Sequence, residues 1–201
     1  MFKRFKAEHS LREYDFTSAM FPTVQDRDYW NSFPDRSYIK KAEEALDYDW
    51  PTVRATAFME FIKSGKRLSE RVHFEKVDRL TDLVFAELIE NEGRFLPQIV
   101  DGLCAICEET TWCSSAHWAD EIPRNIHDVR EPYLDLVAGI AAEVLSMAVS
   151  LLKKPLLEFC PEIVDRVEYE LDRRIKTPYM THTDYWWMGY GREYPTTGTL
   201  G

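Results

Sequence analysis

The sequence lacks a long uninterrupted apolar stretch. The longest apolar run, Leu136 to Leu152, is interrupted by Glu143, Ser146 and Ser150, and it is shorter than the ~20 apolar residues that cross a bilayer. We therefore expect a buried helix there and no membrane partner. The amino terminus also lacks the apolar core that follows the basic residues of a signal peptide, although a start placed after a lost signal would look the same.

The chain also has fewer basic than acidic residues. Asp and Glu number 35 against 25 Lys and Arg, which gives a formal net charge of −10. Nucleic-acid binding needs a basic face, so we expect no nucleic-acid partner. The chain is 45% hydrophobic and 13% aromatic, which is enough for a core and argues against disorder. At 201 residues it forms one domain or part of a larger one.

The four cysteines do not complete a recognisable metal motif. Cys104 and Cys107 have the C-x-x-C spacing, but no second such pair and no His-x3-His follows. Cys113 and His117 lie close enough to leave a small metal site open as an alternative. Free cysteines are commonly small apolar packing residues, and we therefore expect no metal and no cofactor.

Hydrophobic periodicity predicts helices along almost the whole chain. The clearest stripe has Val77, Leu80, Val84 and Leu88 at steps of three and four, with Glu92-Gly93 as the expected end. The expected helices are Tyr38–Tyr48, Val53–Lys63, Val72–Asn91, Leu96–Glu109, Pro132–Leu152 and Pro161–Lys176.

No segment has a convincing strand pattern, so the predicted class is all-α. Short connections make successive helices pack antiparallel, which leads to a bundle or a curved array of hairpins. The chain has no strict repeat of the kind found in helical solenoids, which makes a solenoid the weaker choice.

An ordered set of short segments between Phe16 and Tyr190 resembles the heparinase II/III-like family. The segments are Phe21-Pro22, Asp26-Arg27-Asp28-Tyr29-Trp30, Glu60-Phe61, Gly65-Lys66-Arg67, Glu92-Gly93-Arg94-Phe95, Cys107-Glu108-Glu109, Trp112, His117, Tyr169-Glu170-Leu171-Asp172-Arg173-Arg174-Ile175 and Tyr185-Trp186-Trp187. The resemblance implies antiparallel helical hairpins that form part of an (α/α) toroid over residues 1–190. It also implies a polysaccharide lyase-like parent, in a family whose members are often periplasmic or secreted.

The last residues suggest a shifted reading frame. In one branch of this family, a segment like Trp186-Trp187-Met188-Gly189 leads into Asn-Asn-Trp-Asn-Pro-Trp. The codons for residues 196–201, Thr-Thr-Gly-Thr-Leu-Gly, admit that same motif when they are read one base earlier. We therefore expect residues 191–201 to be a disordered, frameshifted tail and the natural domain to continue beyond them.

Lyases of this family cleave uronic-acid glycans by β-elimination, with Tyr and His as acid and base and with polar groups around the uronate carboxylate. The resemblance places the main catalytic groups around and after the end of this chain, so we assign no catalytic residue and expect this chain to be inactive. The alternative is a non-catalytic helical module that binds a glycan or peptide, or serves assembly. The expected partners are an acidic or neutral glycan and a second copy of the chain, joined through the carboxy-terminal third.

The loop around Trp112 and His117 is the best candidate for a glycan site, since an aromatic surface beside a histidine suits sugar stacking and hydrogen bonding. Tyr185, Trp186 and Trp187 are further substrate-binding candidates, of which one would stack on sugar while the others are core. His117 is the candidate for chemistry, and Glu108 and Glu109 are candidates to orient it. The alternative is structural: the tryptophans close helix ends and His117 caps a neighbouring turn.

Overall fold

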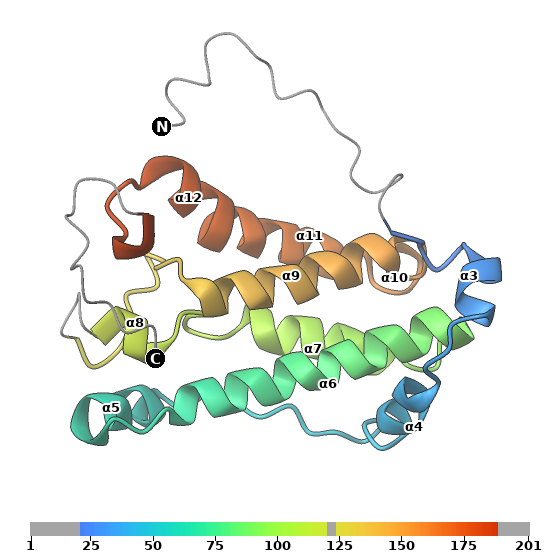
Figure 1. Ribbon diagram of the computed structural model, residues 1–201, viewed down its shortest axis with the longest axis horizontal. Coiled ribbons are helices and arrows are strands. Elements are labelled where there is room, and N and C mark those ends of the chain that lie inside the picture. The colour runs from blue at the N-terminus through green and yellow to red at the C-terminus, as the bar shows by residue number, and fades with distance from the viewer. Residues whose placement is uncertain (1–20, 120–123, 189–201) are drawn as a thin grey trace, which may run out of the picture.

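A computed structural model describes residues 21–119 and 124–188 of the chain, and every regular element in this part is a helix (Figure 1). The all-α prediction is confirmed. The helices are α3 (Arg27–Asn31), α4 (Ser37–Glu43), α5 (Ala55–Ser64), α6 (Leu68–Glu90), α7 (Leu96–Cys107), α8 (Ser115–Ala119), α9 (Leu136–Leu151), α10 (Lys153–Phe159), α11 (Pro161–Leu171), the π-helix η1 (Asp172–Lys176), α12 (Thr177–Thr181) and the 3-10 turn η2 (Trp186–Met188). The expected tail, residues 191–201, lies outside the described part.

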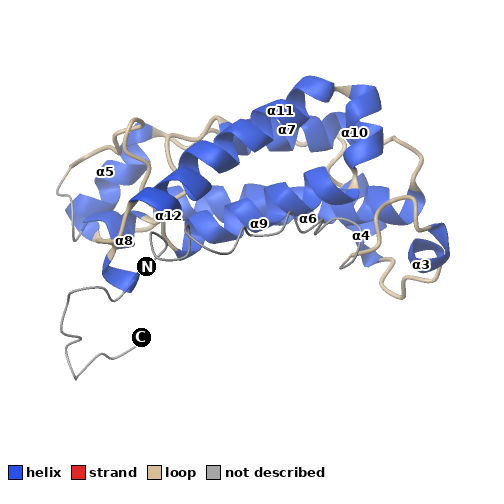
Figure 2. Cartoon of the chain, turned by 90° about the horizontal axis from the view of Figure 1, so that it is seen from above, coloured by secondary structure: helices blue, strands red, loops and turns tan. Residues whose placement is uncertain are grey.

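Four long helices, α6, α7, α9 and α11, form the framework. They alternate in direction, and α6 packs on α7 and α9 while α11 packs on the same two neighbours. Figure 2 shows the same arrangement from above, with α11 over α7 and α9 beside α6. The expected antiparallel hairpins are therefore present as α6/α7 and α9/α11, and the core lies between them.

Helix α6 starts earlier and ends earlier than its apolar stripe predicts. It begins at Leu68, and its carboxy-terminal cap is Asn91, in the left-handed conformation with φ of 56°; Gly93, the expected end, also has a positive φ, of 77°. Asparagine is one of the few residues other than glycine that adopts this conformation at low cost. Glu87, 1% exposed, then fixes the turn into α7 by accepting hydrogen bonds from the backbone N–H groups of Gly93 (2.8 Å) and Phe95 (3.3 Å).

Helix α9 begins at Leu136 and not at Pro132 as expected. Asp135 is the N-cap, and its carboxylate accepts a 2.8 Å hydrogen bond from the backbone N–H of Ala138. An N-cap side chain that accepts a hydrogen bond from a first-turn N–H group stabilises the start of a helix, so Asp135 sets the boundary of α9. Helix α9 packs against α6 and α11, so most of it is buried as expected, but Leu136 and Ile140 remain 76% and 40% exposed.

In the described part of the chain, no single helix is long and apolar enough to cross a membrane; α9 and α10 would pass that test only as a pair, which bends by 80°.

Helix α11 does not present the uncovered apolar side that an open edge of a toroid would have. Ile163, Val164 and Val167 are buried against α7 and α9, whereas the opposite face is largely charged and carries Tyr169 as its exposed large apolar residue. The inward apolar face of this last long helix is therefore covered by its two neighbours. Its continuation is also not a plain α-helix, because residues 172–176 form a π-helical turn, a feature that often occurs at functional sites.

Candidate functional site

The extended segment before α9, residues 132–135, is where the separate groups of predicted site residues meet. The indole N–H of Trp187 donates to the carbonyl of Leu134 at 2.8 Å, and the Tyr185 hydroxyl lies 3.4 Å from the carbonyl of Pro132. On the same segment, Asp135 holds the loop that carries His117. The fold therefore brings the aromatic block and the His117 loop to one end of the bundle.

Asp135 orients His117. Its Oδ2 atom is 2.8 Å from His117 Nδ1 and accepts a 2.9 Å hydrogen bond from the backbone N–H of Ser114. A carboxylate is an acceptor, so the imidazole donates from Nδ1 and its Nε2 carries the lone pair in the neutral form. The prediction that Glu108 or Glu109 orients His117 is wrong, because Glu108 is exposed and Glu109 serves other partners.

Trp112 does not offer a face to a ligand. Its side chain is 2% exposed, its indole N–H donates to the carbonyl of Ile106 at 2.8 Å, and the Arg174 guanidinium lies 4.8 Å from the ring centroid. The prediction of sugar stacking by Trp112 is corrected for that reason. Tyr185 is also buried, at 6% exposed, and stacks on Trp187, which remains half-buried.

The side chains of Trp118 and Trp186 lie outside the described part. Of the predicted aromatic residues whose side chains are described, Trp187 is therefore the one that remains partly open to a ligand.

A second polar cluster, which the sequence did not predict, lies inside the protein beside the first. Glu109 accepts a 2.6 Å hydrogen bond from His73 Nδ1, and its other oxygen is 2.5 Å from Lys76 Nζ. All three side chains are at most 5% exposed. Lys76 also donates to the carbonyl of Ala105 in the last turn of α7, where a positive charge is favoured by the helix dipole.

Two serines tie α6 to the His117 loop. Ser114 Oγ donates to Glu70 at 2.6 Å, and Ser115 Oγ lies 2.9 Å from Ser69 Oγ. Because the Ser114 backbone N–H also binds Asp135, this one residue links Glu70 on α6 to the orienting partner of His117. Polar side chains at inward positions of the α6 stripe are the sequence signal that could have indicated this network.

Arg174 supports the loop from the side of the π-helix. It donates to the carbonyls of Cys107 and Glu109 at 2.9 and 2.7 Å and to Glu170 at 2.6 Å. Burial raises the pKa of Glu170, but hydrogen bonds from Arg174 and Arg173 outweigh that effect and hold the pKa below its usual value. Arg174 is therefore a buried residue that joins η1 to the loop after α7.

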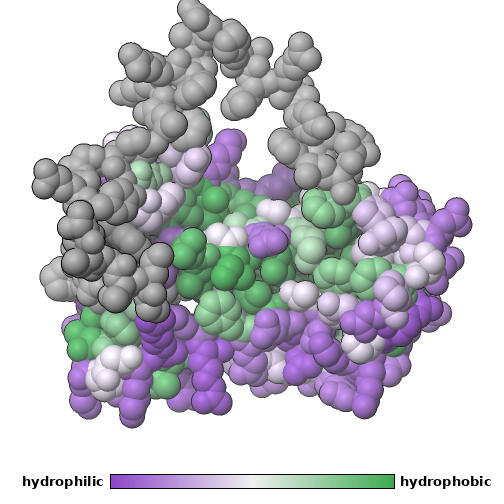
Figure 3. Space-filling model, in the orientation of Figure 1, coloured by the Kyte–Doolittle hydropathy of each residue, from purple (hydrophilic) through white to green (hydrophobic). Residues whose placement is uncertain are grey.

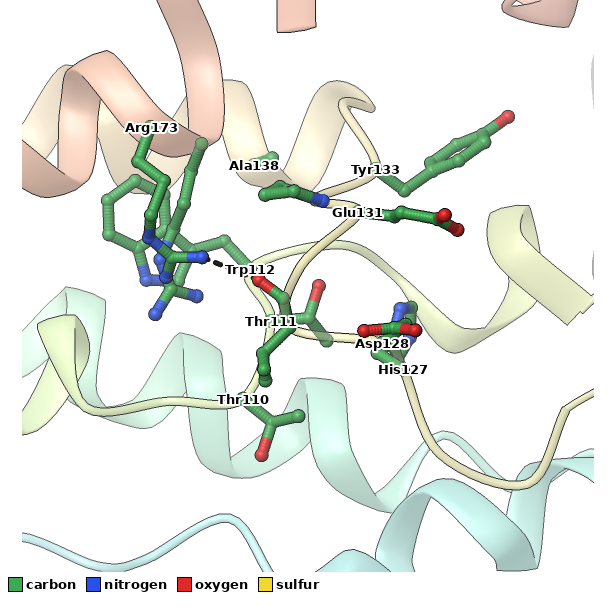
Figure 4. Close-up of a pocket in the computed structure, with 12 residues that line it drawn as sticks. Thr110, Thr111, Trp112, His127, Asp128, Glu131, Tyr133, Ala138 and Arg173 are labelled. Carbon is green, nitrogen blue, oxygen red and sulfur yellow. Dashed lines mark hydrogen bonds between the residues drawn. The ribbon is translucent and has the colours of Figure 1, made fainter. Parts of the chain in front are cut away.

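A small pocket lies between this loop, residues 127–133 and the arginines of η1 (Figure 4). Its volume is about 10 Å³, which is enough for one water molecule and too small for a sugar ring. Among its lining residues is His127, whose ring makes an edge contact with Phe58. Burial lowers the pKa of His127 from 6.5 to about 4.

The buried His127 makes stability sensitive to acid. The unfolded chain binds a proton at pH 6.5 and the folded chain only near pH 4, so stability is full above pH 6.5 and is lost as the pH falls toward 4. The expected loss is up to about 3 kcal/mol. In urea unfolding between pH 7 and 4, His127→Gln should show a smaller loss than wild type, while His182→Gln, at an exposed histidine, should follow wild type. Equal slopes for wild type and His127→Gln would contradict this assignment.

The cysteines are placed as packing residues. Cys107 is fully buried and Cys113 is 5% exposed, and burial raises the pKa of the Cys107 thiol to about 12 and that of Cys113 well above its usual value. A thiol held protonated is a poor metal ligand and a poor nucleophile. Within residues 21–119 and 124–188, no group of three or more His, Cys, Asp or Glu side chains is arranged to hold a metal ion.

Comparison with known proteins finds no protein-family model and no curated protein that matches the chain.

Proposed function

We propose that this chain is a glycan-binding helical module of the heparinase II/III-like type, which holds its ligand at the end of the bundle near His117 and Trp187 without cleaving it. The observation that carries the proposal is the convergence of the two predicted segments on residues 132–135. An oriented histidine beside a half-buried indole is the combination that sugar recognition uses: hydrogen bonding from the imidazole and stacking on the ring.

The chemistry of this end of the molecule is suited to binding more than to β-elimination. His117, with its Nδ1 proton held by Asp135, has the tautomer of a general base. Elimination also needs a group that neutralises the uronate carboxylate and an acid for the leaving oxygen. Arg174, which supports the loop that leads to His117, is buried and bound to two carbonyls and Glu170. We therefore expect the described residues to bind a glycan without turning it over.

The arrangement of the long helices supports a relationship to (α/α) toroids. Helix α6 lies beside α9 and α7 lies beside α11, so like members of consecutive hairpins are neighbours. Two successive hairpins of a double ring have this neighbour relation, and a four-helix bundle shares it. The toroid thus remains part of the proposal, and the observed architecture is an antiparallel bundle of two hairpins.

The proposal is tested by titrating the chain with neutral and uronic-acid oligosaccharides. We expect chemical-shift changes in the His117 loop and at Trp187, and no ultraviolet-absorbing unsaturated product from heparin, alginate, chondroitin or hyaluronan. His117→Ala should weaken binding roughly 2- to 10-fold, as expected for the loss of one hydrogen bond. Asp78→Asn, at an exposed position on α6, is the control. Robust turnover, or binding that is insensitive to His117→Ala, would contradict the proposal.

A second candidate function is assembly, favoured by the outer face of α9. Leu136, Gly139 and Ile140 are exposed on this helix, and Figure 3 shows apolar surface across the middle of the same face of the molecule. Contiguous exposed apolar patches commonly mark interaction sites. We propose that two copies of the chain pair through this face about a two-fold axis, with Gly139 allowing close approach of the helices.

The assembly proposal predicts a dimer in light scattering. Leu136→Asn combined with Ile140→Asn should convert it to a monomer with little change in stability, because both side chains already contact solvent. The matched control is Met59→Asn combined with Ile62→Asn, which removes two similarly exposed apolar residues from α5. A monomeric wild-type chain, or a dimer that survives the α9 substitutions, would rule out this interface.

A further inference from the structure

A small cavity lies between α5, α6 and the loop that follows α7. Its polar side is formed by five residues: Ser69, Glu70, His73, Glu109 and Thr111. Its volume is about 10 Å³. A cavity of this volume holds about one water molecule, provided that polar partners are available. The rest of its lining is apolar, but the polar side supplies the partners that an apolar void, which stays dry, does not have.

His73 lines this cavity, and only one of its two ring nitrogens has a hydrogen-bond partner among the described residues. The residue is 4% exposed, and its Nδ1 is 2.6 Å from Glu109. Glu109 is an acceptor that is also paired with Lys76, so the proton of the neutral imidazole belongs on Nδ1. Nε2 is then an acceptor, and it is buried with no hydrogen-bond partner among the described residues. Leaving such a buried acceptor unsatisfied destabilises the fold, so a donor is favoured there.

Glu70 supplies a second acceptor on the same side. It precedes His73 by three residues on α6, so the two side chains lie on one face of the helix. One carboxylate oxygen accepts from Ser114 Oγ at 2.6 Å, and the other is 3.5 Å from an Arg67 nitrogen. A carboxylate offers about four lone-pair positions, which leaves capacity for a further donor.

We propose that this cavity is a binding site for one water molecule, which donates one O–H to His73 Nε2 and the other to the Glu70 carboxylate. The chemistry of the wall selects a small donor, since both available groups are acceptors. The water would join two networks that are otherwise separate. One runs from His117 through Asp135 and Ser114 to Glu70, and the other from His73 through Glu109 to Lys76.

The joined network gives the buried cluster a role at the candidate site. It connects the half-buried His117 to the interior ion pair of Lys76 and Glu109 by a continuous chain of hydrogen bonds. Hydrogen bonds in such a chain polarise and strengthen one another. The charged groups that face it are Lys76 and Arg67 from α6, Glu109 from the loop after α7, and Asp135 at the start of α9. The site does not depend on the glycan-binding proposal, because it is completed by residues of the interior alone.

The proposal is tested on the wild-type chain by nitrogen-15 NMR of the histidines together with a high-resolution crystal structure. The expected result is a His73 ring protonated at Nδ1, a cross-peak between that ring and slowly exchanging water, and density within hydrogen-bonding distance of both Nε2 and Glu70. A dry cavity, a ring protonated at Nε2, or a doubly protonated ring would overturn it.

Variants then separate binding of the water from general packing. Glu70→Gln keeps an acceptor oxygen and should retain the water, whereas His73→Phe removes the acceptor nitrogen and should lose it. Asp78→Asn, at an exposed position of α6, should change neither the density nor the His73 signals. Retention of the water in His73→Phe would show that His73 does not hold it and would refute the assignment. Because the wild-type measurement decides by itself, a variant that fails to fold does not remove the test.

Discussion

Replacing Glu109 with alanine is expected to lower the free energy of unfolding by about 3–5 kcal/mol, the cost of breaking a buried ion pair from one side. Lys76 is 1% exposed and its ammonium group is 2.5 Å from a Glu109 oxygen. Without that carboxylate, the Lys76 charge stays buried beside the Ala105 carbonyl, and His73 loses the acceptor for its Nδ1 proton. Urea unfolding at pH 7 measures the change.

The neighbouring residue provides the control for this prediction. Glu108 is exposed at the end of α7, so Glu108→Ala should change stability by no more than about 0.5 kcal/mol. Adding Lys76→Met to Glu109→Ala should recover part of the loss, because the uncompensated charge is then removed as well. A loss of less than about 1 kcal/mol in Glu109→Ala would mean that water reaches the pair and that the cluster is not a buried one.

The long helices were predictable because their apolar positions have a clear period. The stripe of Val77, Leu80, Val84 and Leu88 on α6 is buried as expected. The same stripe continues to His73 and Glu87 at its two ends, where polar residues occupy inward positions. The predicted helix, Val72–Asn91, includes both. Its start was placed too late because the preceding inward residues, Ser69 and Glu70, are polar, although the fold buries them against the two serines of the His117 loop.

The candidate site could be predicted only in outline. The sequence suggested His117 and Trp187 among the candidate site residues, but it offered no reason to place them near each other. Both residues contact the segment that ends at Asp135. Because the helix was expected to start at Pro132, the N-cap at Asp135 was missed. An aspartate immediately before an apolar run is a typical N-cap, so this signal was present. Its second role, orienting His117 at 2.8 Å, depends on tertiary packing that no local pattern encodes.

Arg174→Lys is expected to destabilise the chain by roughly 3 kcal/mol even though the positive charge is kept. The guanidinium binds three acceptors at once, on Cys107, Glu109 and Glu170, and it covers the ring of Trp112. A lysine ammonium is a point charge on a flexible stem and cannot reproduce this planar set of contacts. The carbonyls of Cys107 and Glu109 would lose this donor, although Cys107 keeps a 3.4 Å hydrogen bond from Arg166, and the loop that leads to His117 would lose its support.

Arg173→Lys is the matched control, because the adjacent arginine is more exposed and shares Glu170 as a partner. It should cost less than about 1 kcal/mol, as is usual for partly exposed ion pairs. If the two substitutions have equal effects on urea unfolding, the buried contacts of Arg174 are not what stabilises the loop. A large loss confined to Arg174→Lys, accompanied by a shift of the Trp112 fluorescence, would instead tie the π-helical turn to the candidate site. The turn would be important for the site because it carries Arg174, whose side chain donates hydrogen bonds to the carbonyls of Cys107 and Glu109.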